Sequence, residues 1–136
     1  MAVIDASVYI ALINAREPDH VRSWTWFERA KASKDPVRAP VLLLAEVAAA
    51  LSRGMGDPAL AHRVVRQLKQ SRAVELVPVG VALAERAARI AAEHRIRGCD
   101  AVYVALAEEL GECLITLDEQ QRERGAAAVL TCRPGE

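Results

Sequence analysis

Short apolar runs alternate with longer Ala- and Leu-rich segments of helical spacing along the whole chain. The runs have the length and the Val, Ile and Leu content of buried strands, and they cover residues 2–5, 37–39, 74–79, 113–117 and 127–131. Strands that alternate with helices connect through right-handed crossovers, which produce a parallel sheet with both faces covered. The sequence therefore predicts an α/β fold, a three-layer sandwich with a central parallel sheet of about five strands between helices.

Capping residues, prolines and glycines predict where the helices begin and end. Asp57 and Pro58 stand in the order of an N-cap and a first helical residue. Pro40 is expected to start a long helix through Arg53, and Gly54 and Gly56 are expected to end it. Asp100 is expected to cap a further helix through Leu110.

The composition favours the same fold class. Hydrophobic residues make up 52% of the chain and aromatic residues only 4%. The core must therefore consist of Ala, Val, Leu and Ile, which suits helices packed on a buried sheet and argues against a β-sandwich or a disordered chain. The 136 residues are enough to bury a real core, so we expect residues 1–136 to form a single domain.

Charge and hydropathy narrow the classes of partner. Lys plus Arg and Asp plus Glu both number 18, so the formal net charge is zero, which argues against strong non-specific binding to DNA. The longest apolar stretches, such as 41–45 and 47–51, fall short of the ~20 residues that span a membrane. With no N-terminal signal pattern either, we expect a soluble, cytoplasmic protein.

The three cysteines do not predict a metal site or a disulfide framework. Cys99, Cys113 and Cys132 show neither a CxxC spacing nor a paired histidine pattern. We interpret them as buried or incidental thiols.

Four acidic residues stand against strongly apolar segments. Asp5 lies in MAVIDASVYIAL, Glu46 in PVLLLAEVAAAL, Asp100 in GCDAVYVALAEEL and Asp118 in ECLITLDEQ. An ionised carboxylate that leaves water needs an ion pair, several hydrogen bonds or a bound cation. No Lys or Arg stands beside Asp5, Glu46 or Asp118 within these runs. A hard divalent metal, Mg²⁺ or Mn²⁺, is therefore the expected partner.

The predicted topology brings these carboxylates together. Asp5 ends the first strand and Asp118 ends the fourth, and open parallel sheets place their sites beyond the carboxyl ends of their strands. Asp100 at the start of its helix and Glu46 about two turns into its own could lean over the same edge. We predict one shared metal site.

Each acid also has a plainer interpretation. Asp5, Asp100 and Asp118 precede helices, where Asp is a favoured N-cap. Glu46 cannot be a cap in mid-helix, but it could face solvent. The four positions together favour a shared site over separate structural roles.

Two hydroxyl residues flank the predicted site. Ser7 follows Asp5 by two residues, and Thr116 precedes Asp118 by two. Each could add a hydroxyl contact to a metal, a water or a phosphate.

The aromatic residues concentrate in one segment. Trp24 and Phe27 lie on an i, i+3 stripe and are expected in the core, whereas Trp26 is expected to point elsewhere and could serve a protein interface.

The ordered set of motifs resembles the PIN-domain ribonucleases, and among them the VapC toxins of toxin-antitoxin pairs. The resemblance covers essentially the whole chain and rests on VIDASV, LLLAEVAAAL, GCDAVYVALAEEL and LITLDEQ, in that order. It implies that Asp5, Glu46, Asp100 and Asp118 correspond to the acidic quartet of that family. Many relatives follow the last Asp with another acid and an aromatic residue. Here Glu119 follows, then two glutamines, so Glu119 either lends a carboxylate or only lies nearby.

The predicted activity is a metal-dependent endoribonuclease acting on single-stranded or loop RNA. The resemblance implies a cognate VapB-like antitoxin as partner and a homodimer. Two other classes stay open. One is a non-catalytic RNA-binding or scaffold module on the same fold. The other is a phosphotransfer domain, which is disfavoured because the chain lacks paired acids after its first strand and a Lys ending a late strand.

Overall fold

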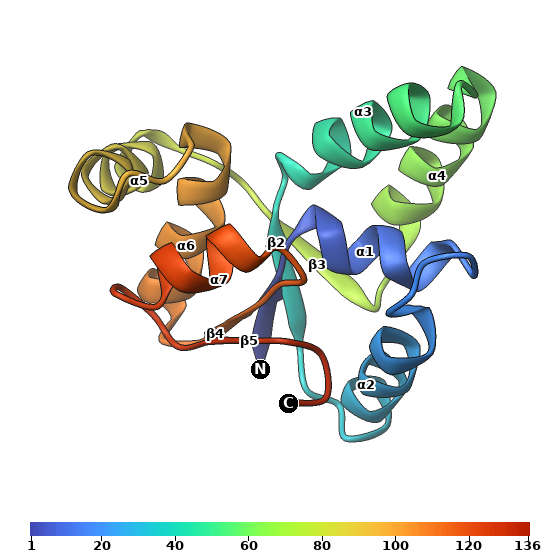
Figure 1. Cartoon of the computed structure of the whole chain (residues 1–136), viewed down its shortest axis with the longest axis horizontal. Helices are drawn as coiled ribbons and strands as arrows, with labels where there is room; N and C mark the ends of the chain where they lie inside the picture. The colour runs from blue at the N-terminus through green and yellow to red at the C-terminus, as the bar shows by residue number, and fades with distance from the viewer.

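Strands and helices alternate along residues 1–136, all of which the computed structural model describes (Figure 1). The strands are β1 (Ala2–Ile4), β2 (Val37–Pro40), β3 (Val74–Val77), β4 (Cys113–Ile115) and β5 (Thr131–Cys132). The helices are α1 (Ala6–Ile13), α2 (His20–Ala32), α3 (Leu43–Met55), α4 (Pro58–Gln70), α5 (Val81–His94), α6 (Gly98–Leu110) and α7 (Glu119–Gly125).

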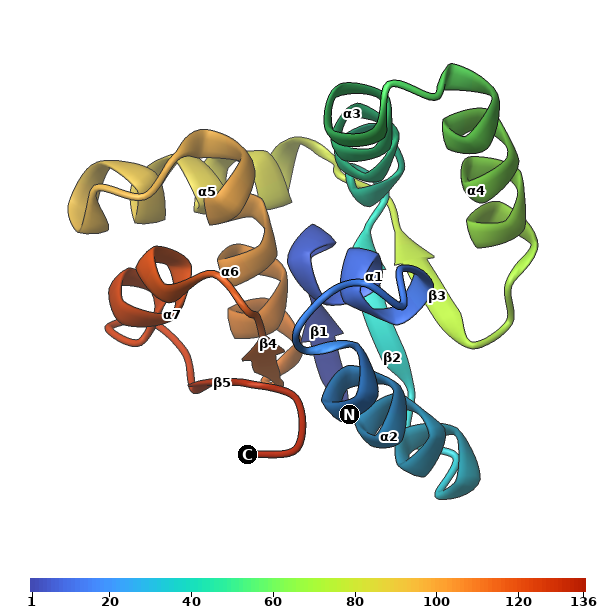
Figure 2. The ribbon, with the colours of Figure 1, turned by 45° about the vertical axis from the view of Figure 1, so that its right-hand side comes forward.

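The five strands form one parallel sheet in the order β3-β2-β1-β4-β5. Helices α1 to α4 cover one face and α5 to α7 cover the other (Figures 1 and 2). The predicted three-layer α/β fold is therefore confirmed. The strand order changes direction between β1 and β4, and such a switch point opens a crevice at the carboxyl ends of the two strands.

The core lies where the central strands meet α6. Val3, Ile4 and Leu114 are fully buried, as expected for strands covered on both faces. Helix α6 packs on β1, β2 and β4 and is buried from Tyr103 to Ala107. None of the helices combines the length and the apolar character that crossing a membrane requires.

The helix expected from Pro40 to Arg53 begins later and ends later. Pro40 is the last residue of β2 and pairs with Val77 of β3, so α3 starts only at Leu43. A proline can close a strand because its carbonyl still accepts a hydrogen bond. The helix ends at Gly56, whose φ of +63° is the left-handed conformation that glycine adopts without strain.

The other predicted boundaries differ in smaller ways. Asp57 caps α4 as expected, because its carboxylate accepts from the backbone N–H of Leu60 at 3.0 Å. The last strand is Thr131–Cys132 instead of residues 127–131. Turn-forming hydrogen bonds to the carbonyl of Gly125 take up the N–H groups of Ala128 and Val129, which therefore do not join the sheet.

The expectation for the aromatic residues was wrong for the two tryptophans. Ser23 and Phe27 form the buried i, i+4 stripe of α2, so Trp26 lies at its edge and packs against the core. Trp24 lies outside the stripe and is 48% exposed. The buried face of α2 is therefore shifted by about one residue from the Trp24 and Phe27 face that hydropathy alone predicts.

Candidate active site

Asp5 lies at the carboxyl end of β1 and is also the N-cap of α1. Its carboxylate is buried and accepts hydrogen bonds from the hydroxyl of Ser7 at 2.5 Å, from the backbone N–H of Val8 at 3.3 Å and from the hydroxyl of Thr116. Asp5 forms no ion pair. Capping and burial therefore coexist at this residue, and its negative charge has no cationic partner.

The register of the sheet explains why Asp5 meets residues more than 100 positions away. Ile4 pairs with Ile115, so the next residues, Asp5 and Thr116, lie side by side at the carboxyl ends of β1 and β4. The hydroxyl of Thr116 also accepts from the backbone N–H of Asp118 at 3.0 Å. As predicted, the ends of the first and fourth strands meet at one edge of the sheet.

Asp118 caps α7 and remains partly exposed. Its carboxylate accepts from the backbone N–H groups of Gln120 and Gln121 at 2.9 and 3.2 Å. The capping interpretation is therefore right for Asp118. It is wrong for Asp100, because α6 begins at Gly98 and places Asp100 in its first turn, where the helix dipole favours a negative charge without a cap.

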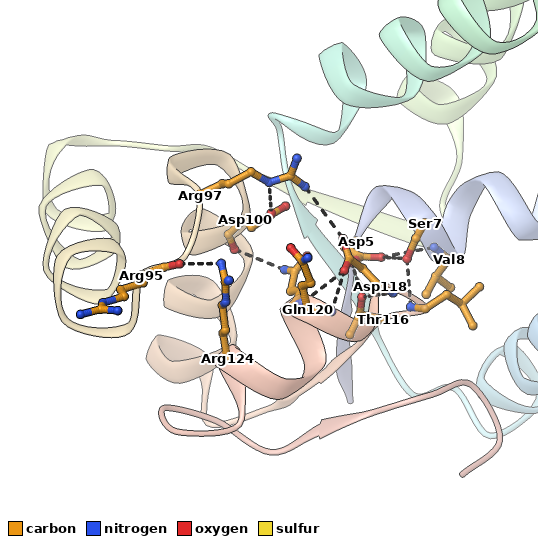
Figure 3. Close-up of polar contacts among 12 residues, drawn as sticks. Asp5, Ser7, Val8, Arg95, Arg97, Asp100, Thr116, Asp118, Gln120 and Arg124 are labelled. Carbon is orange, nitrogen blue, oxygen red and sulfur yellow. Dashed lines mark hydrogen bonds and ion pairs between the residues drawn. The ribbon is translucent and has the colours of Figure 1, made fainter.

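Asp100 and Asp118 are bridged by one arginine (Figure 3). The Nε of Arg97 lies 2.9 Å from Oδ2 of Asp100, and its Nη2 lies 3.9 Å from Oδ2 of Asp118. The hydrogen bond and the charge of Asp100 raise the pKa of Arg97, and the charges of Asp118 and Glu46 raise it further. Three of the four acids thus act on the same guanidinium.

Glu46 lies in α3, is half-buried and forms no ion pair. It faces Tyr103 of α6, whose hydroxyl is buried and has no hydrogen-bond partner. Burial raises the pKa of Tyr103, and the neighbouring Glu46 carboxylate raises it further. Asp5 and Asp100 make smaller contributions in the same direction. Each of the four acids thus influences Arg97 or Tyr103, and we call this set the carboxylate site (Asp5, Glu46, Asp100 and Asp118).

Burial makes the negative charge of Asp5 costly. Burial raises the pKa of Asp5 from its ordinary value of 3.8 to about 6, even though the hydrogen bonds from Ser7, Thr116 and Val8 lower it. The charge of Asp100 adds to the increase. A cation bound next to Asp5 would reverse this shift.

The donor set fits a hard divalent cation, although the side chains do not yet surround one. Carboxylate oxygens are the ligands that Mg²⁺ and Mn²⁺ prefer, and the unpartnered hydroxyl of Tyr103 supplies a further polar group beside Glu46. As the side chains stand, no three acidic, imidazole or thiol groups lie close enough together to hold a metal ion. Arg97 occupies oxygens of two of the acids.

The flanking residues divide into two groups. Ser7 and Thr116 both donate their hydroxyl hydrogens to Asp5, so they orient that carboxylate. Glu119 forms ion pairs with Arg122 and Arg133, which hold its carboxylate in a separate surface cluster. Glu119 is therefore a neighbour of the carboxylate site and not one of its members.

Sequence reasoning missed Arg97 and Tyr103. Both stand three residues from Asp100, one before it and one after it, and this spacing places side chains on one face of a helix. The signal was present for Arg97, because an Arg three residues from an Asp is an ordinary helical ion pair. Tyr103 carried no comparable signal, since a tyrosine in an apolar helix is usually a core residue.

Three comparisons relate the chain to known proteins. The model of the PIN domain family matches residues 2–127. VapC20 of Mycobacterium tuberculosis, described as a toxin that cleaves the sarcin-ricin loop, is 25% identical, with a TM-score of 0.77 and coverage of 98% of this chain and 100% of VapC20. No curated protein matches the chain in sequence.

More distant structures share the fold alone. FitAcB from Neisseria gonorrhoeae is 17% identical, with a TM-score of 0.74 and 98% coverage of both chains. A DNA-bound VapBC structure from Salmonella typhimurium is 18% identical, with a TM-score of 0.72 and coverage of 97% of this chain and 96% of that one.

Proposed function

The chain belongs to the PIN-domain family, whose model spans nearly all of it, and we propose that it is a divalent-metal-dependent endoribonuclease that hydrolyses phosphodiester bonds of single-stranded or loop RNA. The observation that carries the proposal is Asp5. It is a buried carboxylate with a raised pKa and no cationic partner, at the switch point of the sheet. A site of this kind is suited to a ligand that brings positive charge.

In this proposal Asp5, Glu46, Asp100 and Asp118 are the catalytic residues and hold Mg²⁺ or Mn²⁺. When bound, the metal supplies activation of a water for in-line attack on the phosphodiester and neutralises the charge that develops. Asp5 directly follows β1, Glu46 lies in α3, Asp100 lies in α6, and Asp118 follows β4 as the N-cap of α7.

The supporting residues fix the orientation of these carboxylates. Ser7 and Thr116 hold both oxygens of Asp5, Ser7 at Oδ1 and Thr116 at Oδ2. The hydroxyl of Ser7 also accepts from the backbone N–H of Leu117 at 2.9 Å, which ties α1 to the end of β4. Gln121 donates its amide to the carbonyl of Asp100 at 3.3 Å and links α7 to α6. Hydrogen bonds that involve α1, the end of β4, α6 and α7 therefore hold these residues in position.

The relatives suggest the biological setting. VapC20 is described as a toxin that cleaves the sarcin-ricin loop, and VapBC of Salmonella typhimurium is bound to DNA in its structure. We propose that this chain is likewise the toxin of a toxin-antitoxin pair, with a VapB-like antitoxin as partner. The proposal includes a homodimer, a cytoplasmic location and a single PIN-like domain over residues 1–136.

The alternative is a non-catalytic RNA-binding or scaffold module on the same fold. No observation on the carboxylate site favours it, because a module that only binds RNA gains nothing from a buried, unpaired carboxylate facing a polyanion. It predicts RNA binding that persists in EDTA, without cleavage at any metal concentration.

The test is RNA cleavage by the purified chain, freed of any partner. A mixed structured RNA pool is incubated with Mn²⁺, Mg²⁺ or EDTA, beside the variant Asp100→Asn. Glu109→Gln is the matched control, because Glu109 lies on the same helix, is exposed and forms no ion pair. We expect discrete metal-dependent cuts that persist in Glu109→Gln and disappear in Asp100→Asn.

Two results would count against the nuclease. Equal cutting by wild type and Asp100→Asn would indicate a contaminating nuclease. Absence of cutting by a folded wild type that still binds RNA in EDTA would favour the scaffold module.

A further inference from the structure

We propose that Arg97 is the resident counter-ion of the carboxylate site, and that a divalent metal must displace its guanidinium in order to bind. This inference rests on the proposed metal-dependent function and concerns its regulation. Arg97 would compete with the metal within the chain and thereby set the metal concentration at which the site becomes loaded.

The position of Arg97 suits a counter-ion that can leave. It is the residue immediately before α6, and its side chain is 77% exposed. Its Nε donates to Oδ2 of Asp100 at 2.9 Å, while its Nη2 lies 3.9 Å from Oδ2 of Asp118 (Figure 3). The guanidinium thus connects α6 to the cap of α7, although most of its surface remains in water.

No other basic side chain serves this role. Arg97 is the sole Lys, Arg or His that forms an ion pair with any member of the carboxylate site. The nearby Arg122 pairs with Glu119 and Glu136, and Arg124 donates to the backbone carbonyl of Arg95. Loss of Arg97 would therefore leave the four acids without a cation from the chain.

The geometry makes arginine and metal mutually exclusive partners. Arg97 contacts Oδ2 of Asp100 and Oδ2 of Asp118. Oδ1 of Asp118 already accepts from two backbone N–H groups of α7, so a metal held by Asp118 would compete with Arg97 for Oδ2. A divalent ion between the two acids would also repel the positive guanidinium.

An ordinary ion pair within one helix does not account for both contacts of Arg97. Lys31 and Glu28 on α2 form such an i, i+3 pair at 2.6 Å, and it stays within one helix. Arg97 forms the i, i+3 pair with Asp100 and in addition reaches Asp118 on another element. The second contact is the one that marks Arg97 as a part of the carboxylate site.

The test is the affinity for Mn²⁺ alone, measured by isothermal titration without RNA. We expect Arg97→Gln to bind Mn²⁺ about tenfold more tightly than wild type, because one positive charge within a few ångströms of the metal is removed. Arg97→Lys keeps the charge and should stay close to wild type. Lys31→Gln loses the same charge from an i, i+3 pair on α2 and should leave the affinity unchanged.

The outcomes separate this inference from the proposed function. Equal affinity in wild type and Arg97→Gln, or weaker binding by Arg97→Gln, would overturn the counter-ion role while metal binding itself stands. An equal gain in Lys31→Gln would reduce the effect to net charge and would also overturn it. If neither wild type nor Arg97→Gln binds Mn²⁺ while both melt cooperatively, the metal-dependent function fails, and this inference fails with it.

Discussion

Two buried carboxylates, Glu112 and Asp5, lie at opposite ends of the neighbouring strands β4 and β1, and only Glu112 has a cationic partner. Glu112 precedes β4, its side chain is 2% exposed, and it forms an ion pair with Arg38 of β2. Arg38 also pairs with Glu75 of β3 at 3.1 Å. Asp5 follows β1 at the other end, is equally buried, and receives hydrogen bonds but no cation. The chain thus supplies a cationic partner to Glu112 and none to Asp5.

The difference separates a structural charge from a candidate functional one. At Glu112 the positive partner is built into the sheet, so the charge is balanced within the fold. At Asp5 no cationic partner is present, and burial raises the pKa of the carboxyl to about 6. A buried charge without a partner is costly, and a fold that keeps one gains from it only when a ligand completes the site.

The largest expected effect is on the rate of RNA cleavage, which should depend on Asp5 and not on Glu112. Asp5→Asn should lower metal-dependent RNA cleavage at least about 1,000-fold, since it removes a proposed metal ligand. Glu112→Gln should leave the cleavage rate of folded protein within about threefold of wild type, because Glu112 lies at the far end of β4. Single-turnover cleavage of one RNA substrate measures both. Similar losses in the two variants would remove the functional distinction.

The pH dependence of stability should reveal the unpaired charge of Asp5 directly. Below pH 3.8 Asp5 is protonated in both the folded and the unfolded state, and between 3.8 and about 6 only the folded state keeps the proton. The contribution of Asp5 to the free energy of unfolding therefore falls as the pH rises through this window, by about 3 kcal/mol in total.

Urea denaturation in EDTA from pH 4 to 8, wild type beside Asp5→Asn, measures this contribution. The stability of wild type relative to Asp5→Asn should decrease towards pH 7 and then stay constant. A difference that is independent of pH would mean that the buried carboxylate of Asp5 has an ordinary pKa.

Breaking the balanced pair should cost stability instead of activity. Glu112→Gln should lower the free energy of unfolding by about 2 kcal/mol, because it leaves the guanidinium of Arg38 without its buried partner. Glu75→Gln is the control and should cost less than about 1 kcal/mol, since Glu75 is largely exposed. If Glu112→Gln left the free energy of unfolding unchanged, the buried ion pair would make no net contribution to stability.

The smallest effect concerns the unpartnered hydroxyl at the carboxylate site. Tyr103 is fully buried and its hydroxyl has no hydrogen-bond partner. Tyr103→Phe should therefore leave the free energy of unfolding unchanged or raise it by up to about 1 kcal/mol in EDTA. A loss above about 2 kcal/mol would instead place a strong hydrogen bond between Tyr103 and Glu46.

The meeting of Asp5 and Asp118 at one edge of the sheet could be predicted from the sequence, whereas the ion pair of Glu112 with Arg38 was not predicted. The apolar context of Asp5 and Asp118 and the strand-helix alternation predict that both reach one edge of a parallel sheet, and the register of Ile4 with Ile115 places them there. Local patterns sufficed for these two residues because a residue that follows a parallel strand lies at the carboxyl end of the sheet, where the switch point opens its crevice.

Other features depended on packing that a pattern does not encode. Arg97 is an exposed residue immediately before α6, and its contact with Asp118 requires α7 to lie beside α6. The late start of α3 depends on the pairing of Pro40 with Val77 in a neighbouring strand. The exposure of Trp24 depends on which face of α2 meets the core. Each is a tertiary contact between segments whose own propensities do not require it.

The central claim is that the buried carboxylate of Asp5 lacks a cationic partner, which a divalent metal supplies. The most direct measurement is thermal unfolding of wild type, Asp5→Asn and Glu112→Gln in EDTA and in Mn²⁺. Wild type and Glu112→Gln should each gain roughly 5–10 °C in Tm at an Mn²⁺ concentration about a hundredfold above Kd, whereas Asp5→Asn should gain little. An unchanged Tm in wild type, or an equal gain in Asp5→Asn, would contradict the account.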